Sequence, residues 1–188
     1  MNSNNLGIKE KGKLNKVNSK YILMIIFNNI NLKKCLEIIK YNKNLKKRIE
    51  INFNHYKKYS ENYSSIEIEI KLVKYEYDKF INIKKGDEEY YHIYFNNNKE
   101  EIKRNYINED EEINKIKIKI DYQVKSFKQL FSNCKCIESI NFKKFYRINI
   151  NNMSYMFDEC SSLKELNLNN FNISHLIDMN SMFCWMFK

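Results

Sequence analysis

Residues 153–171, MSYMFDECSSLKELNLNNF, repeat the apolar pattern of residues 127–145, FKQLFSNCKCIESINFKKF, and a third copy begins at Met179. The copies are offset by 26 positions, the difference between 153 and 127. A constant period of this length indicates one short structural unit that stacks on copies of itself. The apolar spacing Leu-x-x-Leu-x-Leu is typical of a strand that turns alternate side chains inward. We therefore expect residues 124–188 to form a solenoid of two full 26-residue units and a truncated third.

The composition is that of a folding chain, with 43% hydrophobic and 14% aromatic residues among 188. Its net charge of +10 is concentrated towards the N-terminal end. The abundance of Lys and Asn and the absence of Pro also fit an A+T-rich genome, so they are weak evidence for function. Residues 1–20 lack an apolar period, and we expect them to form a disordered basic tail.

Residues 64–123 have the period-two alternation of half-buried strands. The segments 66–72 and 116–124 alternate Ile with charged residues, and residues 91–95 indicate a third strand. Asn96 to Asn98 predict a hairpin turn into a strand over residues 102–107. If the first and last strands are neighbours, Glu67 and Glu69 face Lys117 and Lys119.

Residues 21–63 have the period of short helices, because Ile22, Ile25, Ile26 and Ile30 share one helical face. The predicted fold class is therefore α+β. It consists of a helical N-terminal segment, a small β-rich middle region and a C-terminal leucine-rich-repeat solenoid.

The repeated Met-Phe, Cys, Leu-x-x-Leu-x-Leu and Phe positions over residues 124–188 closely resemble the BspA-like leucine-rich-repeat family. The resemblance implies a right-handed solenoid that binds proteins or cell-surface ligands and has no enzymatic activity. The chain departs from that pattern at Met186, which stands where a third Cys is expected.

A second resemblance is to the F-box, a short helical module that binds a Skp1-like adaptor. It rests on an apolar skeleton within residues 20–51, although a Leu-Pro pair and a Trp of that module are missing. It implies a substrate receptor of a ubiquitin ligase as the alternative function. The adaptor-binding residues would be Ile22, Leu23, Ile26, Phe27, Ile30, Leu32, Cys35 and Leu36.

The outward side chains of the repeat strands are the predicted partner-binding residues, and the partner is a protein of unknown identity. The alternative is that these side chains only keep the repeats soluble. A third hypothesis is nucleic-acid binding through the basic N-terminal third. The predicted partner-binding set is Glu138, Ser139, Asn141, Lys143, Lys164, Glu165, Asn167 and Asn169.

No catalytic, cofactor-binding or metal-binding pattern is found. His55, His92 and His175 are dispersed, and Cys134 and Cys160 occupy equivalent repeat positions where a small buried side chain is expected. The longest apolar run, residues 21–27, is too short to span a bilayer. We expect a non-enzymatic interaction protein without cofactor, small-molecule substrate or membrane span, located in the cytoplasm.

Overall fold

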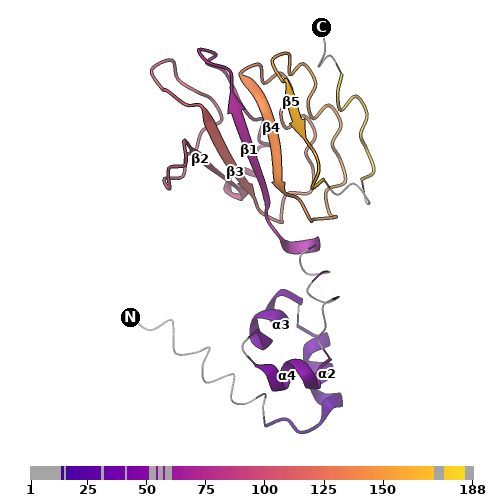
Figure 1. Cartoon of the computed structure of the whole chain (residues 1–188). Helices are drawn as coiled ribbons and strands as arrows, with labels where there is room; N and C mark the ends of the chain where they lie inside the picture. The colour runs from indigo at the N-terminus through magenta and orange to yellow at the C-terminus, as the bar shows by residue number, and fades with distance from the viewer. Residues whose placement is uncertain are drawn as a thin grey trace. The chain divides into compact units, whose positions relative to one another are not determined.

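The computed structural model describes residues 14, 16–30, 32–40, 42–50, 54, 57, 61–171 and 176–184. The chain divides into two compact units, Met1–Ser60 and Glu61–Lys188 (Figure 1). Most of the predicted basic tail, as well as His55, His175 and Met186, lies outside the described residues.

The first unit contains the helices α2 (Lys20–Asn28), α3 (Leu32–Ile39) and α4 (Lys43–Arg48). Ser19 caps α2 by accepting from the Ile22 amide at 3.3 Å, and Asn42 caps α4 by accepting from the Leu45 amide at 3.0 Å. The three helices share a small core. Its buried members are Leu23, Phe27, Cys35, Leu36, Ile39 and Leu45.

The helical face shared by Ile22, Ile25, Ile26 and Ile30 is not the face of α2 that packs against the core. Ile22 and Ile25 are 49% and 44% exposed, whereas Leu23 and Phe27 are buried. The physical reason is that α2 is apolar around most of its circumference, so periodicity does not select the face that packs.

The second unit is built on a five-stranded mixed sheet with the order β2-β3-β1-β4-β5 (Figure 1). All neighbouring strands are antiparallel except β4 and β5, which are parallel. A 3₁₀ helix, η1 (Glu88–Tyr90), leads into β2. The strands are β1 (Ile66–Leu72), β2 (Tyr91–Phe95), β3 (Lys115–Ile120), β4 (Ile137–Lys144) and β5 (Glu165–Asn167).

The alternating segments of the sequence form strands, although the strand predicted over residues 116–124 ends at Ile120. In β1 and β3 every second residue is buried, because the Ile side chains face the core and the charged ones face solvent. The predicted cross-strand pairing is confirmed: Glu67 is opposite Lys119, and Glu69 is opposite Lys117.

The turn at Asn96 is also confirmed, but the strand predicted after it was wrong. Asn96 and Asn97 both have positive φ, at 47° and 64°, as a tight hairpin turn requires. Between the turn and residue 107 the chain makes only two isolated bridges, Ile93 with Ile102 and Lys79 with Tyr106. Ile102 and Tyr106 therefore pair with different partners, which prevents a continuous ladder.

The prediction of a C-terminal leucine-rich-repeat solenoid was wrong, because the unit is a small mixed sheet with few helices. β4 pairs with β5 on one side at a 26-residue offset, from Ser139 to Glu165, but on its other side it pairs with antiparallel β1. The repeat strands therefore continue a sheet that begins outside the repeats. The 26-residue period predicts that β4 and β5, as copies of one repeat, are neighbours. It does not predict that β1 pairs with the other edge of β4.

The turns that precede β4 and β5 are stacked by backbone hydrogen bonds, each of which joins an amide to a carbonyl 25 residues further along the chain. The amides of Phe127 and Phe131 donate to the carbonyls of Asn152 and Met156, and the amide of Phe157 donates to Met182. Phe131, Phe157 and Phe183 stack in one column, with ring centroids 5.8 and 5.7 Å apart. Phe131 and Phe157 form a single core with the apolar face of the sheet, whereas Phe183 is 44% exposed.

The same turns place non-glycine residues in the left-handed region of backbone space, again at an offset of 26. Gln129, Tyr155 and Ser181 have φ of 57°, 55° and 52°, and Asn133 and Glu159 have φ of 57° and 55°. For a residue with a Cβ this conformation costs about 1–2 kcal/mol.

Replacing Glu159 with Gly should therefore raise the free energy of unfolding by about 0.5–1 kcal/mol. Glycine removes the left-handed strain, and this gain exceeds the entropy it adds to the unfolded chain. Glu159 is exposed, so few contacts are lost. Urea denaturation followed by circular dichroism measures the change. Glu165→Gly, in exposed β5, is the matched control and should lose stability; a loss in both variants would contradict the strain argument.

Candidate interaction surface

The solvent side of the five-stranded sheet, called here the outer face, holds most of the predicted partner-binding residues. Asn141 and Lys143 project from β4, and Glu165 and Asn167 project from β5. Ser139 lies on the same side of β4 but is buried, with 9% of its surface exposed. The register places Ser139 beside Glu165 and Asn141 beside Asn167. These residues therefore come together across the β4–β5 pair.

The other three predicted residues lie at the margin of this surface. Lys164 contacts Glu138 through an ion pair of 3.0 Å, and the Lys164 amide donates to the Glu138 carbonyl. Asn169 lies exposed beyond β5, and its amide donates to the Asn167 side chain at 3.0 Å.

The outer face is wider than the repeat strands, which sequence reasoning missed. Pairwise registers align Tyr94, Lys117, Glu69, Asn141 and Asn167 in one row across all five strands. The signal was present in the alternation of the middle region. Only the pairing of β1 with β4 shows that both sets of residues share one surface.

Two shallow grooves lie side by side on this face. One has a volume of about 260 Å³ and is bounded by Tyr94, Lys117 and Glu67. The other has a volume of about 290 Å³ and is bounded by Lys71, Asn141, Asn167 and their neighbours. Glu69 and Lys143 line both grooves, so the two grooves adjoin each other on the outer face.

Glu69 is the electrostatic centre of the outer face. Its carboxylate is 2.8 Å from the Lys115 ammonium and 3.7 Å from that of Lys143. Partial burial raises the pKa of Glu69, but the hydrogen bond from Lys115 and the charges of Lys143 and Lys117 outweigh it and lower the pKa overall. The carboxylate therefore stays ionised and holds its lysines in place.

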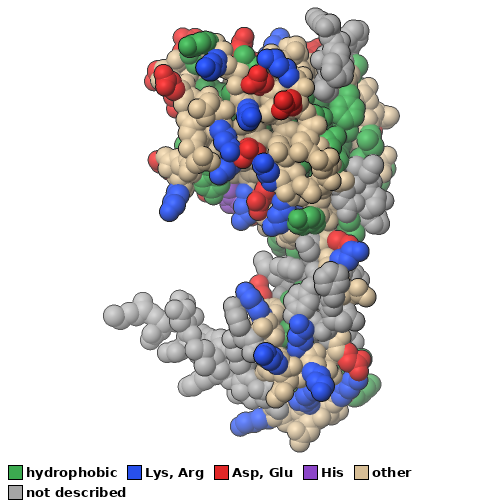
Figure 2. All heavy atoms as spheres, viewed as in Figure 1, with side chains coloured by type: hydrophobic (Ala, Val, Ile, Leu, Met, Phe, Trp, Pro, Cys, Tyr) green, Lys and Arg blue, Asp and Glu red, His purple; other side chains and the backbone are tan. Residues whose placement is uncertain are grey.

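Lysines outnumber acids on the outer face. Figure 2 shows Lys and Arg side chains interspersed with Asp and Glu over the strands. Lys71, Lys117 and Lys119 are exposed, and within the described chain each has no carboxylate at ion-pair distance. Their ammonium groups are free to meet negative charge on a partner.

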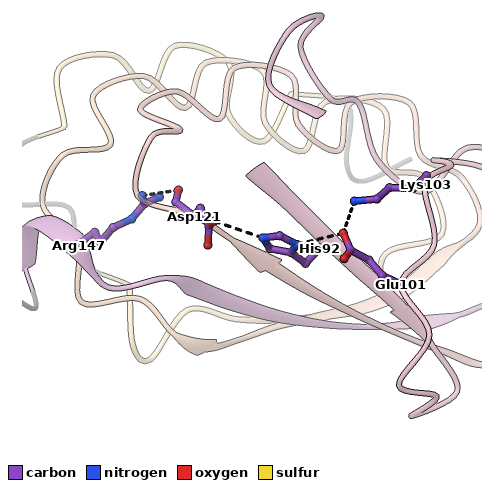
Figure 3. Close-up of polar contacts among 5 residues, drawn as sticks. All are labelled: His92, Glu101, Lys103, Asp121 and Arg147. Atoms are coloured by element: carbon purple, nitrogen blue, oxygen red, sulfur yellow. Dashed lines mark hydrogen bonds and ion pairs between the residues drawn. The ribbon is translucent and has the colours of Figure 1, made fainter. Parts of the chain in front are cut away.

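A polar network at the β2 edge ties three segments together (Figure 3). The His92 ring contacts Glu101 through Nδ1 at 3.0 Å and Asp121 through Nε2 at 3.3 Å. Lys103 pairs with Glu101, and its hydrogen bond, followed by that of His92, lowers the pKa of Glu101. Both ring nitrogens of His92 therefore have a carboxylate partner. The two contacts link β2 to the segment that contains Glu101 and to the residue that follows β3, Asp121.

Arg147 lies beside that network and is completely buried. Its Nη1 donates to the Asp121 carbonyl at 2.7 Å (Figure 3), whereas Nε and Nη2 have no hydrogen-bond partner in the described part of the chain. Burial lowers the pKa of Arg147 to about 10, but the guanidinium remains charged at neutral pH.

The repeat cysteines are buried small side chains. Cys134, Cys136 and Cys160 have no exposed surface, and the Cys160 thiol donates to the Phe131 carbonyl at 2.9 Å. Over the described residues, no cluster of three or more His, Cys, Asp or Glu has a metal-binding arrangement.

The residues predicted to bind an adaptor do not share an accessible face. Leu23, Phe27, Cys35 and Leu36 are buried in the core of the helical unit. Ile26 and Ile30 are half-buried, and Ile22 is exposed. The side chain of Leu32 is not among those that the structure describes.

Comparison with known proteins gives one family match for the chain. Residues 98–187 are similar to a family described as "Mycoplasma protein of unknown function, DUF285". The DUF285-like segment contains β3, β4 and β5, but β1 and β2 precede it. No curated protein and no solved structure matches the chain.

This match corrects both resemblances drawn from the sequence. No leucine-rich-repeat family and no F-box family matches, so the assignments to the BspA-like leucine-rich repeats and to the F-box were wrong. DUF285 is related to the BspA-like repeat proteins, which explains the shared spacing of the apolar residues. None of the helices in the described residues is long and apolar enough to cross a membrane.

Proposed function

We propose that this chain is a non-enzymatic protein-binding protein and that the outer face of its sheet is the surface on which a partner protein docks. The observation that carries the proposal is the row of polar side chains that runs across all five strands, from Tyr94 to Asn167. Lys117 and Asn167 are exposed in this row, and Tyr94, Glu69 and Asn141 are half-buried. A surface of that width is available to a macromolecule, whereas the grooves of 260 and 290 Å³ are small and shallow for a buried ligand.

The charges on this face support an acidic partner. The unpaired ammonium groups of Lys71, Lys117 and Lys119 attract carboxylates, and Tyr94 adds an aromatic side chain of the type enriched in binding interfaces. A reducing compartment is also part of the proposal, because all five cysteines are free thiols.

Site-specific photo-crosslinking tests the proposal. A photoreactive phenylalanine replaces Asn141 on the outer face, and in a matched control it replaces Tyr75, an exposed loop residue. We expect one protein from the chain's own cell extract to crosslink from position 141 and not from position 75. That protein is then identified and purified, and its binding to the unmodified chain is measured directly.

Charge reversal at Lys117 is the quantitative prediction. Lys117→Glu should raise the dissociation constant of the purified partner by about tenfold at low salt, because it puts a negative charge where an acidic surface docks. Lys128→Glu, on an exposed turn before β4, changes the net charge equally and should have little effect. Equal effects of the two variants, or equally tight binding of an oligonucleotide to the outer face, would overturn the proposal.

A further inference from the structure

A pocket of about 510 Å³ is lined by η1, by β2 and by residues 102–105. It is separate from the grooves of the outer face and shares no lining residue with them. Its volume falls within the range of small-molecule sites, about 300–1,000 Å³. Its apolar lining consists of Ile83, Tyr91, Ile93 and Ile102.

Two carboxylates stand at this pocket without a cationic partner. Glu88 and Glu89 are exposed, and neither forms an ion pair within the described chain. Glu88 accepts a hydrogen bond from the Gly86 amide at 2.7 Å, and Glu89 accepts one from the Tyr90 hydroxyl, but a carboxylate can accept several. These acids therefore retain acceptor sites for an ammonium group.

The bases that line the pocket are already neutralised. Lys103 pairs with Glu101, as Figure 3 shows, and Arg104 pairs with Glu111. Counting these partners, four carboxylates (Glu88, Glu89, Glu101 and Glu111) surround two bases, a net charge of −2. The local field favours a cationic ligand.

Arg104 supplies one unused donor. Its guanidinium lies 5.3 Å from the centroid of the Phe95 ring and 5.4 Å from that of Tyr106, which holds it in place. Nη1 is shielded from solvent and has no hydrogen-bond partner among the described residues. A small movement of the side chain, which is 21% exposed, is needed to bring this donor to an acceptor oxygen of a ligand, and the gain of a partner for the buried donor favours that movement.

We propose that this pocket binds an apolar residue that carries a free α-ammonium group. The ammonium pairs with Glu88 and Glu89, the carbonyl oxygen accepts from Arg104, and the branched side chain packs on Ile93 and Ile102. The N-terminal residue of a peptide and a free apolar amino acid share this chemistry.

The test uses the full chain with ¹³C-labelled Ile methyl groups and a titration followed by NMR. Leucinamide should shift the methyl signals of Ile83, Ile93 and Ile102, with a dissociation constant in the millimolar range that is usual for so small a ligand. N-acetyl-leucinamide lacks only the charge and should bind at least about tenfold more weakly. 3-Methylbutylamine lacks the carbonyl acceptor of Arg104 and should also bind more weakly.

A conservative variant links the effect to the acids. Glu89→Gln should weaken leucinamide binding several-fold, while Glu159→Gln, at an exposed turn position that does not line the pocket, leaves it unchanged. Leu-Gly-Gly and free leucine then distinguish a peptide terminus from an amino acid, and tighter binding of either one supports the proposal. It is overturned if leucinamide causes no methyl shifts at about 10 mM, or if N-acetyl-leucinamide binds as well as leucinamide. Neither result bears on the outer face, because the two sites share no residue.

Discussion

Phe157→Ala should lower the free energy of unfolding of the sheet-containing unit by about 3–5 kcal/mol, the usual cost of removing a buried phenyl ring. Phe157 has no exposed surface and lies in the middle of the aromatic column, between Phe131 and Phe183. Its removal leaves a cavity between two stacked turns and takes away both ring contacts. The backbone hydrogen bonds on either side hold those turns in place, so they cannot collapse freely into the space.

Urea denaturation followed by circular dichroism of the sheet measures this loss. Tyr155→Ala is the matched control, because Tyr155 lies in the same turn but is 39% exposed, and its replacement should cost about 1 kcal/mol or less. A loss below about 1 kcal/mol for Phe157→Ala would contradict the description of the column as the centre of the core.

Cys136 and Cys160 should react with iodoacetamide at least about a thousandfold more slowly in the native protein than in the unfolded chain. Burial raises the pKa of Cys160 and of Cys136 to about 12, from an ordinary value near 9. Near pH 8 the thiolate, the reactive form, is then about a thousandfold scarcer, and steric shielding slows the reaction further. Burial also raises the pKa of Cys134.

Mass spectrometry of the alkylated peptides compares the sites within one sample. Cys184 is partly exposed, so it should be modified first in the native protein and provides the internal control. Addition of urea should bring all five thiols to similar rates. Alkylation of Cys160 as fast as Cys184 in the native state would show that the stacked turns open readily, and it would contradict the packing described for them.

Local alternation and repeat spacing were sufficient to predict several elements of this protein. Strands β1, β2 and β3 follow from Ile and Tyr at every second position, because a period of two separates a buried face from a solvated one. The cross-strand pairing of Glu67 with Lys119 was predicted from the same alternation, and the turn at Asn96 was predicted from the run of Asn residues. The 26-residue offset likewise relates Ser139 to Glu165.

The candidate surface was only partly predictable. The outward residues of β4 and β5 were selected by the same alternation that selects the inward Leu and Ile. Tyr94, Lys117 and Glu69 were missed because they belong to strands far away in sequence. The pocket beside Arg104 was missed as well, since Glu88 and Ile102 approach each other only through the pairing of Ile93 with Ile102.

The sequence by itself determined which residues alternate and which recur every 26 positions, and therefore most of the strands, although not the absence of a strand over residues 102–107. Only the tertiary structure decided that β1 pairs with β4, so that the repeats extend a mixed sheet, and that Leu23 rather than Ile22 is buried in α2. The physical reason is that periodicity encodes the two faces of one element. Which strand or helix packs beside a given element depends on the strand edges and apolar faces of other elements, whose residues are distant in the chain.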